Sequence, residues 1–232
     1  MLNNKSYQTI IFECSDISLL HLKINEYYQY LNASGNFFII TDNQYNQFGI
    51  QNSFFDFIEV SVNKGFICKN IIILPESGKN EQLKKNVRYL LWCVKNTEEN
   101  YFDKDKIREK HIWKDVEWGK RSQNYNPLGK DPGNVWLPTE DDGKGKIINH
   151  IALDFESVIN RCIDSTCLNN SHVLIRFFSK LNQKNINHQF IEFEKYSFLF
   201  RKSVERNIKN NIDNQFKDPE ATVFFDSCED MK

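Results

Sequence analysis

The sequence predicts an α/β fold in which helices cover both faces of one sheet. Short apolar runs typical of buried strands alternate with longer segments whose apolar residues recur at helical spacing. The chain has 232 residues, of which 40% are hydrophobic and 19 are Phe, and this is enough for one sizeable core. The order strand–helix–strand–helix–strand in its first part indicates a sheet with helices on both faces.

The first part of the chain provides four of the expected strands and two helices. The strands are continuous runs of Ile, Leu, Val and Phe, and they span residues 7–12, 37–41, 67–74 and 87–94. The expected helices span residues 17–31 and 48–64. Gly65 is expected to cap the second helix, because glycine readily adopts the left-handed conformation at which helices end.

The composition changes at residues 97–146, which are polar, rich in Lys, Asp, Glu and Trp, and poor in Val, Ile and Leu. We interpret them as an inserted polar loop or small subdomain. Helical periodicity returns at residues 147–162. Two further strands, at 171–178 and 189–194, and a helix at 196–208 complete one domain over residues 1–210. Residues 211–232 form a polar tail with a short apolar run at 223–225.

Composition and motifs exclude several classes of function. The net charge of −1 means that any nucleic-acid contact has to come from a local patch or a partner. Six Cys without a C-x-x-C pair, and His without ligand spacing, predict reduced thiols and no metal site. No Walker loop, G-x-G-x-x-G or G-x-S-x-G is present. Without a signal-peptide pattern or a long apolar run, we expect no membrane contact and an intracellular protein, cytoplasmic if bacterial and nuclear if eukaryotic.

Residues 101–130 carry the mixture of charge and aromatic rings typical of nucleic-acid contact. They hold eight Lys or Arg against five Asp or Glu, with Trp and Tyr interleaved. Cations contact phosphates and aromatic rings stack on bases. The alternative is a solvated subdomain whose Trp side chains form a small core of their own.

Residues 126–136, NPLGKDPGNVW, are the most distinctive stretch, because two Pro and two Gly in eleven residues predict a loop of specific shape. This stretch resembles the NPxGKNPGDVW segment of the permuted (beta) class of site-specific DNA amino-methyltransferases, which methylate the exocyclic amine of adenine or cytosine. Further segments resemble that family in the same order, at residues 86–96, 101–108, 150–163, 173–177 and 190–208. The resemblance implies a Rossmann-like methyltransferase sheet in permuted order, with residues 97–146 as an inserted DNA-facing loop or subdomain.

Two motifs of that family are missing from this chain. In the family the first strand ends in a [DNS]-P-P-[YFW] tetrapeptide that holds the flipped base, whereas here it ends in Phe12–Ser15, FECS. The cofactor loop DPFxGSGT corresponds to Ile175–Lys180, IRFFSK, which has neither the carboxylate nor the glycines. The resemblance therefore implies a member without catalytic or cofactor-binding residues.

We therefore expect an inactive subunit that pairs with an active DNA methyltransferase, which carries S-adenosylmethionine, and that helps to hold double-stranded DNA. The side chains expected to contact DNA are Lys114, Lys120, Arg121, Asn124, Tyr125, Lys130 and Trp136. One alternative is an active methyltransferase with divergent motifs, in which Glu13, Ser15 or Asp16 holds the target amine and Glu194 the ribose. The other is a structural or inhibitory partner protein that does not contact DNA.

Overall fold

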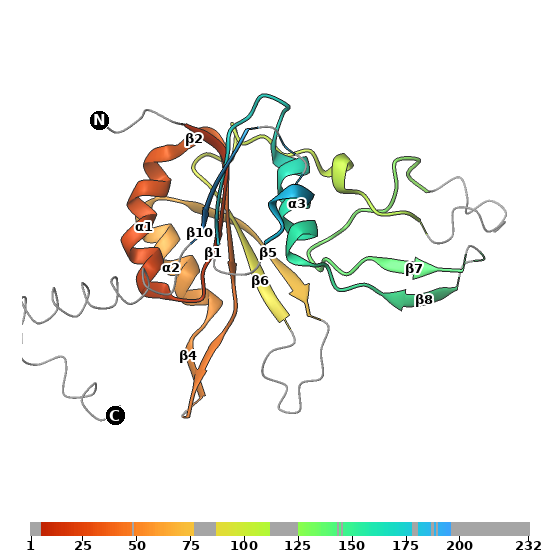
Figure 1. Ribbon diagram of the computed structural model, residues 1–232, viewed down its shortest axis with the longest axis horizontal. Helices are drawn as coiled ribbons and strands as arrows, with labels where there is room; N and C mark the ends of the chain where they lie inside the picture. The colour runs from red at the N-terminus through yellow and green to blue at the C-terminus, as the bar shows by residue number, and fades with distance from the viewer. Residues whose placement is uncertain are drawn as a thin grey trace, which may run out of the picture. The chain divides into compact units, whose positions relative to one another are not determined.

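A six-stranded sheet forms the centre of the computed structural model (Figure 1). The structure describes residues 6–47, 49–76, 87–111, 125–142, 144, 146–177, 181–186, 188 and 190–195. The strands follow the order β10-β9-β1-β2-β6-β5 across the sheet. Their bounds are β1 Tyr7–Glu13, β2 Leu31–Thr41, β5 Ile67–Pro75, β6 Val87–Val94, β9 Val173–Phe177 and β10 Ile191–Lys195. One compact unit extends from Met1 to Glu194.

The strands lie in a permuted order in the sheet, because the first strand of the chain lies in its middle. Strand β1 pairs in parallel with β2 on one side and with β9 on the other, so a strand from late in the chain lies beside the first one. Phe12 of β1 thereby lies level with both Ile39 and Arg176. Strand β6 is antiparallel to β2 and to β5. This arrangement confirms the predicted α/β fold with a permuted, Rossmann-like sheet.

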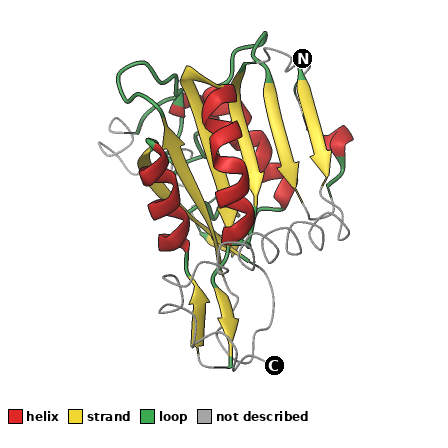
Figure 2. Ribbon diagram, turned by 90° about the vertical axis from the view of Figure 1, so that its left-hand side faces the viewer, coloured by secondary structure: helices red, strands yellow, loops and turns green. Residues whose placement is uncertain are grey.

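Two helices, α1 (Ile17–Tyr30) and α2 (Phe54–Lys64), cover one face of the sheet (Figures 1 and 2). Helix α1 begins where the Asp16 carboxylate accepts a hydrogen bond from the backbone N–H of Ser18, at 3.0 Å. Its Tyr27 ring is fully buried and lies 5.0 Å from the ring of Phe12 and 5.3 Å from that of Phe37. These contacts form the aromatic core of this face.

Helix α3 (Phe155–Thr166) covers the opposite face (Figure 1). It buries Val158, Ile159 and Cys162 in a core that includes Ile11 of β1 and Ile175 of β9. Because side chains alternate along a strand, Ile11 and Glu13 point to the α3 face, whereas Phe12 points to the α1 face. Both faces are therefore covered, as the continuous apolar strands predicted.

The structure corrects two predicted helices. The helix predicted over residues 48–64 begins only at Phe54, because Ser53 and Asp56 form a capping box, and Gly49–Asn52 is strand β4, paired with β3 (Gln44–Asn46). Residues Ile147–His150 are strand β8, paired with β7 (Thr139–Asp141), and α3 starts after Asp154, whose side chain caps it. Gly65 does cap α2, with φ of +107°.

Strand β2 is longer than predicted, and the remaining elements are short. Strand β2 starts at Leu31, earlier than predicted, and 3₁₀ turns span Lys104–Ile107 (η1) and Gln183–Asn185 (η3). The predicted helix 196–208 and the apolar run 223–225 lie outside the described residues. Among the described helices, none combines the length and the apolar character that a membrane crossing requires.

Candidate functional site

The loop at residues 126–136 has a fixed backbone shape. It opens with a turn at Asn126. The side-chain oxygen of Asn126 accepts a hydrogen bond from the N–H of Leu128 at 2.9 Å, and its backbone carbonyl accepts one from the N–H of Gly129 at 3.0 Å. Gly129 has φ of +114°, and a Cβ atom there would lie 2.5 Å from the carbonyl oxygen of Glu109. Only glycine fits this position, both for its conformation and for the close backbone approach.

Backbone hydrogen bonds hold the loop on two sides. On one side Glu109 and Lys130 exchange N–H···O bonds of 3.0 and 2.7 Å. On the other side Ile73 of β5 donates to the carbonyl of Asn134 at 2.8 Å and accepts from the N–H of Trp136 at 3.0 Å. The loop therefore continues the sheet beyond its edge strand β5 and satisfies backbone groups that an open edge would leave unpaired.

Trp136 anchors the loop in the core below α3. Its side chain is 2% exposed and packs with the apolar residues of that face. The Arg161 guanidinium lies 5.5 Å above the indole ring and is also bonded to the Glu109 carboxylate at 3.1 Å. The predicted DNA contact of Trp136 does not fit this burial, because a covered ring cannot stack on a base. We therefore assign Trp136 a packing role.

Acidic side chains neutralise several cations around the loop. Lys104 contacts Asp131 at 3.0 Å, and this contact together with the N–H of Gly133 holds the pKa of the Asp131 carboxyl below its ordinary value. Arg108 is bound to Asp105 at 2.6 Å. These cations are less available to phosphates than the sequence suggested, because each would have to leave a carboxylate.

Two of the residues predicted to contact DNA, Lys130 within the loop and Tyr125 directly before it, lie in accessible positions. Lys130 is exposed, and Tyr125 is half-buried with its ring 4.9 Å from that of His111. The other predicted contacts, Lys114, Lys120, Arg121 and Asn124, lie outside the described residues. A DNA contact by any of these six residues stays a prediction.

The carboxyl end of β1 is occupied by an ion cluster on the α3 face. Glu13, the last residue of the strand, is 9% exposed, and its carboxylate lies 3.7 Å from the guanidinium of Arg88. Arg88 also contacts Glu76 at 2.7 Å and lies 5.7 Å from the centre of the Phe155 ring. A cavity of about 330 Å³ next to this cluster is lined by Glu76, Arg88, Ala152, Leu153 and Asp154. Arg88 was not among the predicted site residues, because in the sequence it is an ordinary member of the strand predicted at residues 87–94.

The residues that follow Glu13 start helix α1. Asp16 caps the helix, and the Cys14 thiol, which is fully buried, donates to the Asp16 carbonyl at 2.9 Å. Ser15 is exposed. Of the three groups proposed to hold a target amine in an active enzyme, Asp16 is thus engaged in helix capping and Glu13 in the ion cluster.

The carboxyl end of β9 holds a second ion pair, on the α1 face. Arg176 is 7% exposed, contacts the Glu26 carboxylate of α1 at 2.5 Å, and lies 5.0 Å from the centre of the Tyr27 ring. Burial acts to raise the pKa of Glu26, but hydrogen bonds from Arg176 and Lys23 outweigh it and hold that pKa below its ordinary value. This pair joins α1 to the sheet, and its two residues are 150 positions apart in the chain.

These side chains do not fit S-adenosylmethionine in the way the resemblance would require. Ile175, at the position of the cofactor-loop carboxylate, is fully buried in the core beneath α3. Arg176, the next residue, is bound to Glu26. Residues 178–180 of the corresponding loop, and the side chain of Glu194 in β10, lie outside the described part of the structure.

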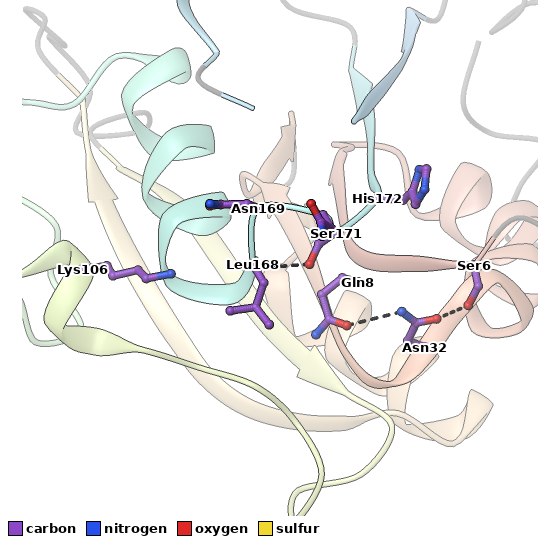
Figure 3. A pocket seen from close by; sticks show the side chains of 9 residues that line it. Ser6, Gln8, Asn32, Lys106, Leu168, Asn169, Ser171 and His172 are labelled. Carbon is purple, nitrogen blue, oxygen red and sulfur yellow. Dashed lines mark hydrogen bonds between the residues drawn. The ribbon is translucent and has the colours of Figure 1, made fainter. Parts of the chain in front are cut away.

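A cavity of about 530 Å³ lies at the opposite, amino ends of β1 and β9 (Figure 3). Amide and hydroxyl groups line much of it, and Asn32 donates to the Gln8 side chain at 3.3 Å. This cavity is separate from the positions considered above, because those lie at the carboxyl ends of the strands. Ligands of open α/β sheets bind beyond the carboxyl ends. Among the described residues, no group of three or more His, Cys, Asp or Glu side chains is placed to hold a metal ion.

Comparisons with known proteins agree with this architecture. Residues 17–179 match the model of a family described as DNA methylase. A search of curated proteins gave no match. The PvuII DNA methyltransferase, which is cytosine-N4-specific, is 14% identical over 83% of this chain and 76% of its own, with a TM-score of 0.53. A putative DNA modification methylase from Thermus thermophilus is 13% identical over 87% of each chain, with a TM-score of 0.50. At these identities the likeness shows a shared fold.

Proposed function

Since this chain belongs to the DNA methylase family, we propose that it is a catalytically inactive subunit that pairs with an active DNA methyltransferase and contributes to DNA binding. One observation carries the proposal. The resemblance places the groups for the target base and the cofactor at the carboxyl ends of β1 and β9. The Arg88–Glu13 contact and the Arg176–Glu26 pair occupy these two ends instead.

At the end of β1, the ion cluster opposes base binding. An amino-methyltransferase has to accept hydrogen bonds from the target amine and stack a ring on the flipped base. The Glu13 carboxylate has the Arg88 guanidinium beside it, and a target amine would have to compete with that cation. The next residues, Cys14 and Ser15, supply no aromatic ring.

At the end of β9, the ion pair opposes cofactor binding. Moving Arg176 aside would leave it and Glu26 partly buried without each other, which costs about 3 kcal/mol in comparable pairs. A carboxylate in place of Ile175 would be buried in an apolar core. The side chains at this end therefore favour a structural role for β9.

Calorimetric titration of S-adenosylmethionine into the purified full chain tests the loss of activity. We expect no binding at micromolar concentrations, while an active methyltransferase titrated in parallel binds. Micromolar binding would overturn the proposal and favour the alternative of an active enzyme with divergent motifs, in which Glu194 holds the ribose.

Purification from the source tests the pairing. A copurifying chain with an intact [DNS]-P-P-[YFW] tetrapeptide and a glycine-containing cofactor loop is the expected partner, because it would supply the base-binding and cofactor groups absent here. A chain that purifies alone, or with partners that lack these motifs, contradicts the pairing.

The contribution to DNA binding rests on the exposed position of Lys130 and the half-buried position of Tyr125 beside it. The chain's net charge of −1 fits a subunit whose partner supplies most of the attraction to phosphates. In the assembled complex, charge reversal of Arg121 and Lys130 to Glu should weaken DNA binding about tenfold at low salt. Lys130→Glu alone is compared with Lys184→Glu, in the exposed turn η3, as its matched control. Equal affinities would favour a structural or inhibitory protein that does not contact DNA.

A further inference from the structure

Two cysteines face each other across the antiparallel pair of β5 and β6. Cys68 of β5 is the register partner of Cys93 of β6, and both are free thiols. Directly opposed residues in an antiparallel pair have Cβ atoms about 4.5–5.5 Å apart, and a disulfide needs about 3.5–4.5 Å. A small local adjustment of the two strands is therefore enough to join the sulfur atoms.

The two thiols differ in the way that a redox pair requires. Cys68 is half-buried and reachable from solvent, whereas Cys93 is fully buried. A hydrogen bond with Cys93 lowers the pKa of Cys68 below its ordinary value, although burial opposes this, and the same hydrogen bond and burial raise the pKa of Cys93. Cys68 is thus the nucleophilic thiolate and Cys93 the neighbouring thiol that can resolve it.

The other described cysteines lack this combination. Cys14, Cys162 and Cys167 are all buried, and burial raises the pKa of Cys162 and of Cys167. They are therefore poor nucleophiles that an oxidant does not reach easily. Among the described cysteines, oxidation is therefore expected to select the pair in β5 and β6.

We propose that Cys68 and Cys93 form a reversible cross-strand disulfide when the chain meets a peroxide. The Cys68 thiolate attacks one peroxide oxygen, the O–O bond breaks, and a sulfenic acid and one water result. The Cys93 thiol then attacks that sulfur, so that the S–S bond forms, the S–O bond breaks and a second water leaves. The two electrons lost by the thiols reduce the peroxide, and a dithiol reverses the change.

The disulfide would tie the edge strand β5 to the interior of the sheet. Strand β5 carries the 126–136 loop through the two backbone hydrogen bonds of Ile73. A bond between β5 and β6 restricts the unfolded chain and resists separation of the edge strand with its loop. Oxidation should therefore raise the Tm of the full chain by about 5 °C.

Peptide mapping of the full chain after hydrogen peroxide treatment tests the proposal. We expect a loss of about 2 Da in intact mass, a peptide pair joined through Cys68 and Cys93, and reversal by dithiothreitol. Cys14, Cys162 and Cys167 should stay reduced and serve as internal controls. Stable over-oxidation of Cys68 without a cross-link, or a link from Cys68 to another cysteine, would overturn it.

Two variants keep the test independent of any loss of folding. Cys68→Ser, at the half-buried position, should fold and show no such loss of mass under the same treatment. Cys93→Ser, whose hydroxyl keeps a hydrogen-bond donor for Cys68, should leave Cys68 as a sulfenic acid, so that dimedone labels it several-fold more than in the natural sequence. A cross-link that persists in Cys68→Ser, or equal dimedone labelling in both chains, contradicts the pairing.

Discussion

The 126–136 loop and the carboxyl ends of β1 and β9 are held by different kinds of contact. The loop keeps the family's Gly, Pro and Trp positions, and its backbone is bound to Ile73 and Glu109. The strand ends carry the ion pairs Arg88–Glu13 and Arg176–Glu26. The difference indicates that backbone geometry and packing explain Gly129 and Trp136 in the loop, whereas charge pairing characterises the two strand ends.

The anchoring of the loop predicts the largest effect on stability. Trp136→Ala removes a ring that is 2% exposed, and we expect it to lower the free energy of unfolding by about 4 kcal/mol. Val135→Ala, next to it but 43% exposed, should cost less than about 1 kcal/mol. Urea denaturation of both variants measures the difference. Similar small losses would mean that the loop is not held by its Trp.

The ion pair at β9 predicts the next effect. Glu26→Gln removes the carboxylate that contacts Arg176, whose side chain is 8% exposed, and should cost about 3 kcal/mol in unfolding free energy. The double variant Glu26→Leu with Arg176→Leu removes both charges and should recover most of that loss, because apolar side chains can replace a buried pair. A double variant as unstable as the single one would show that the pair is not the cause.

Two glycines of the loop predict a smaller, matched pair of effects. Gly129→Ala meets both a positive φ and the Glu109 carbonyl at 2.5 Å, and should cost about 2 kcal/mol. At Gly133, φ is +67° but no atom lies within 4 Å of the added Cβ, so Gly133→Ala should cost about 1 kcal/mol. Thermal unfolding of the two variants side by side gives the comparison. Equal costs would attribute the whole effect to φ and none to the close approach.

The strands and helices show which parts of the fold could be predicted from the sequence. Apolar runs such as residues 7–12 and 87–94 predicted the sheet because buried strands are readable locally. The two predicted helices started too early, whereas the structure starts them at Phe54 and Phe155. The capping side chains Ser53 and Asp154 determine these starts more sharply than periodicity does.

Contacts between segments that are distant in the chain could not be predicted from the sequence. The glycines and prolines predicted that the 126–136 loop has a fixed shape, but its attachment to Ile73 depends on the strand that the fold places beside it. The partner of Arg176 is 150 residues away, and nothing local to either residue indicates the pair. The residues at the two strand ends could be compared with the family's motifs from the sequence alone, whereas the ion pairs at these ends required the structure.

The smallest predicted effect is a pH dependence of stability that comes from the Arg176–Glu26 pair at β9 and not from the loop. The folded-state pKa of Glu26 lies below its ordinary value, so the pair with Arg176 contributes stability that is present above the unfolded pKa, about 4.3, and is lost as pH falls through the folded one. The natural chain should therefore lose more stability than the double leucine variant between pH 5 and pH 3, roughly the window around that pKa. Asp131 near the loop also has a lowered pKa, but it is present in both chains and cancels in the comparison. Urea unfolding at each pH measures the two curves. If they run parallel, the Arg176–Glu26 pair contributes nothing that depends on its charge, and the replacement at β9 acts through packing alone.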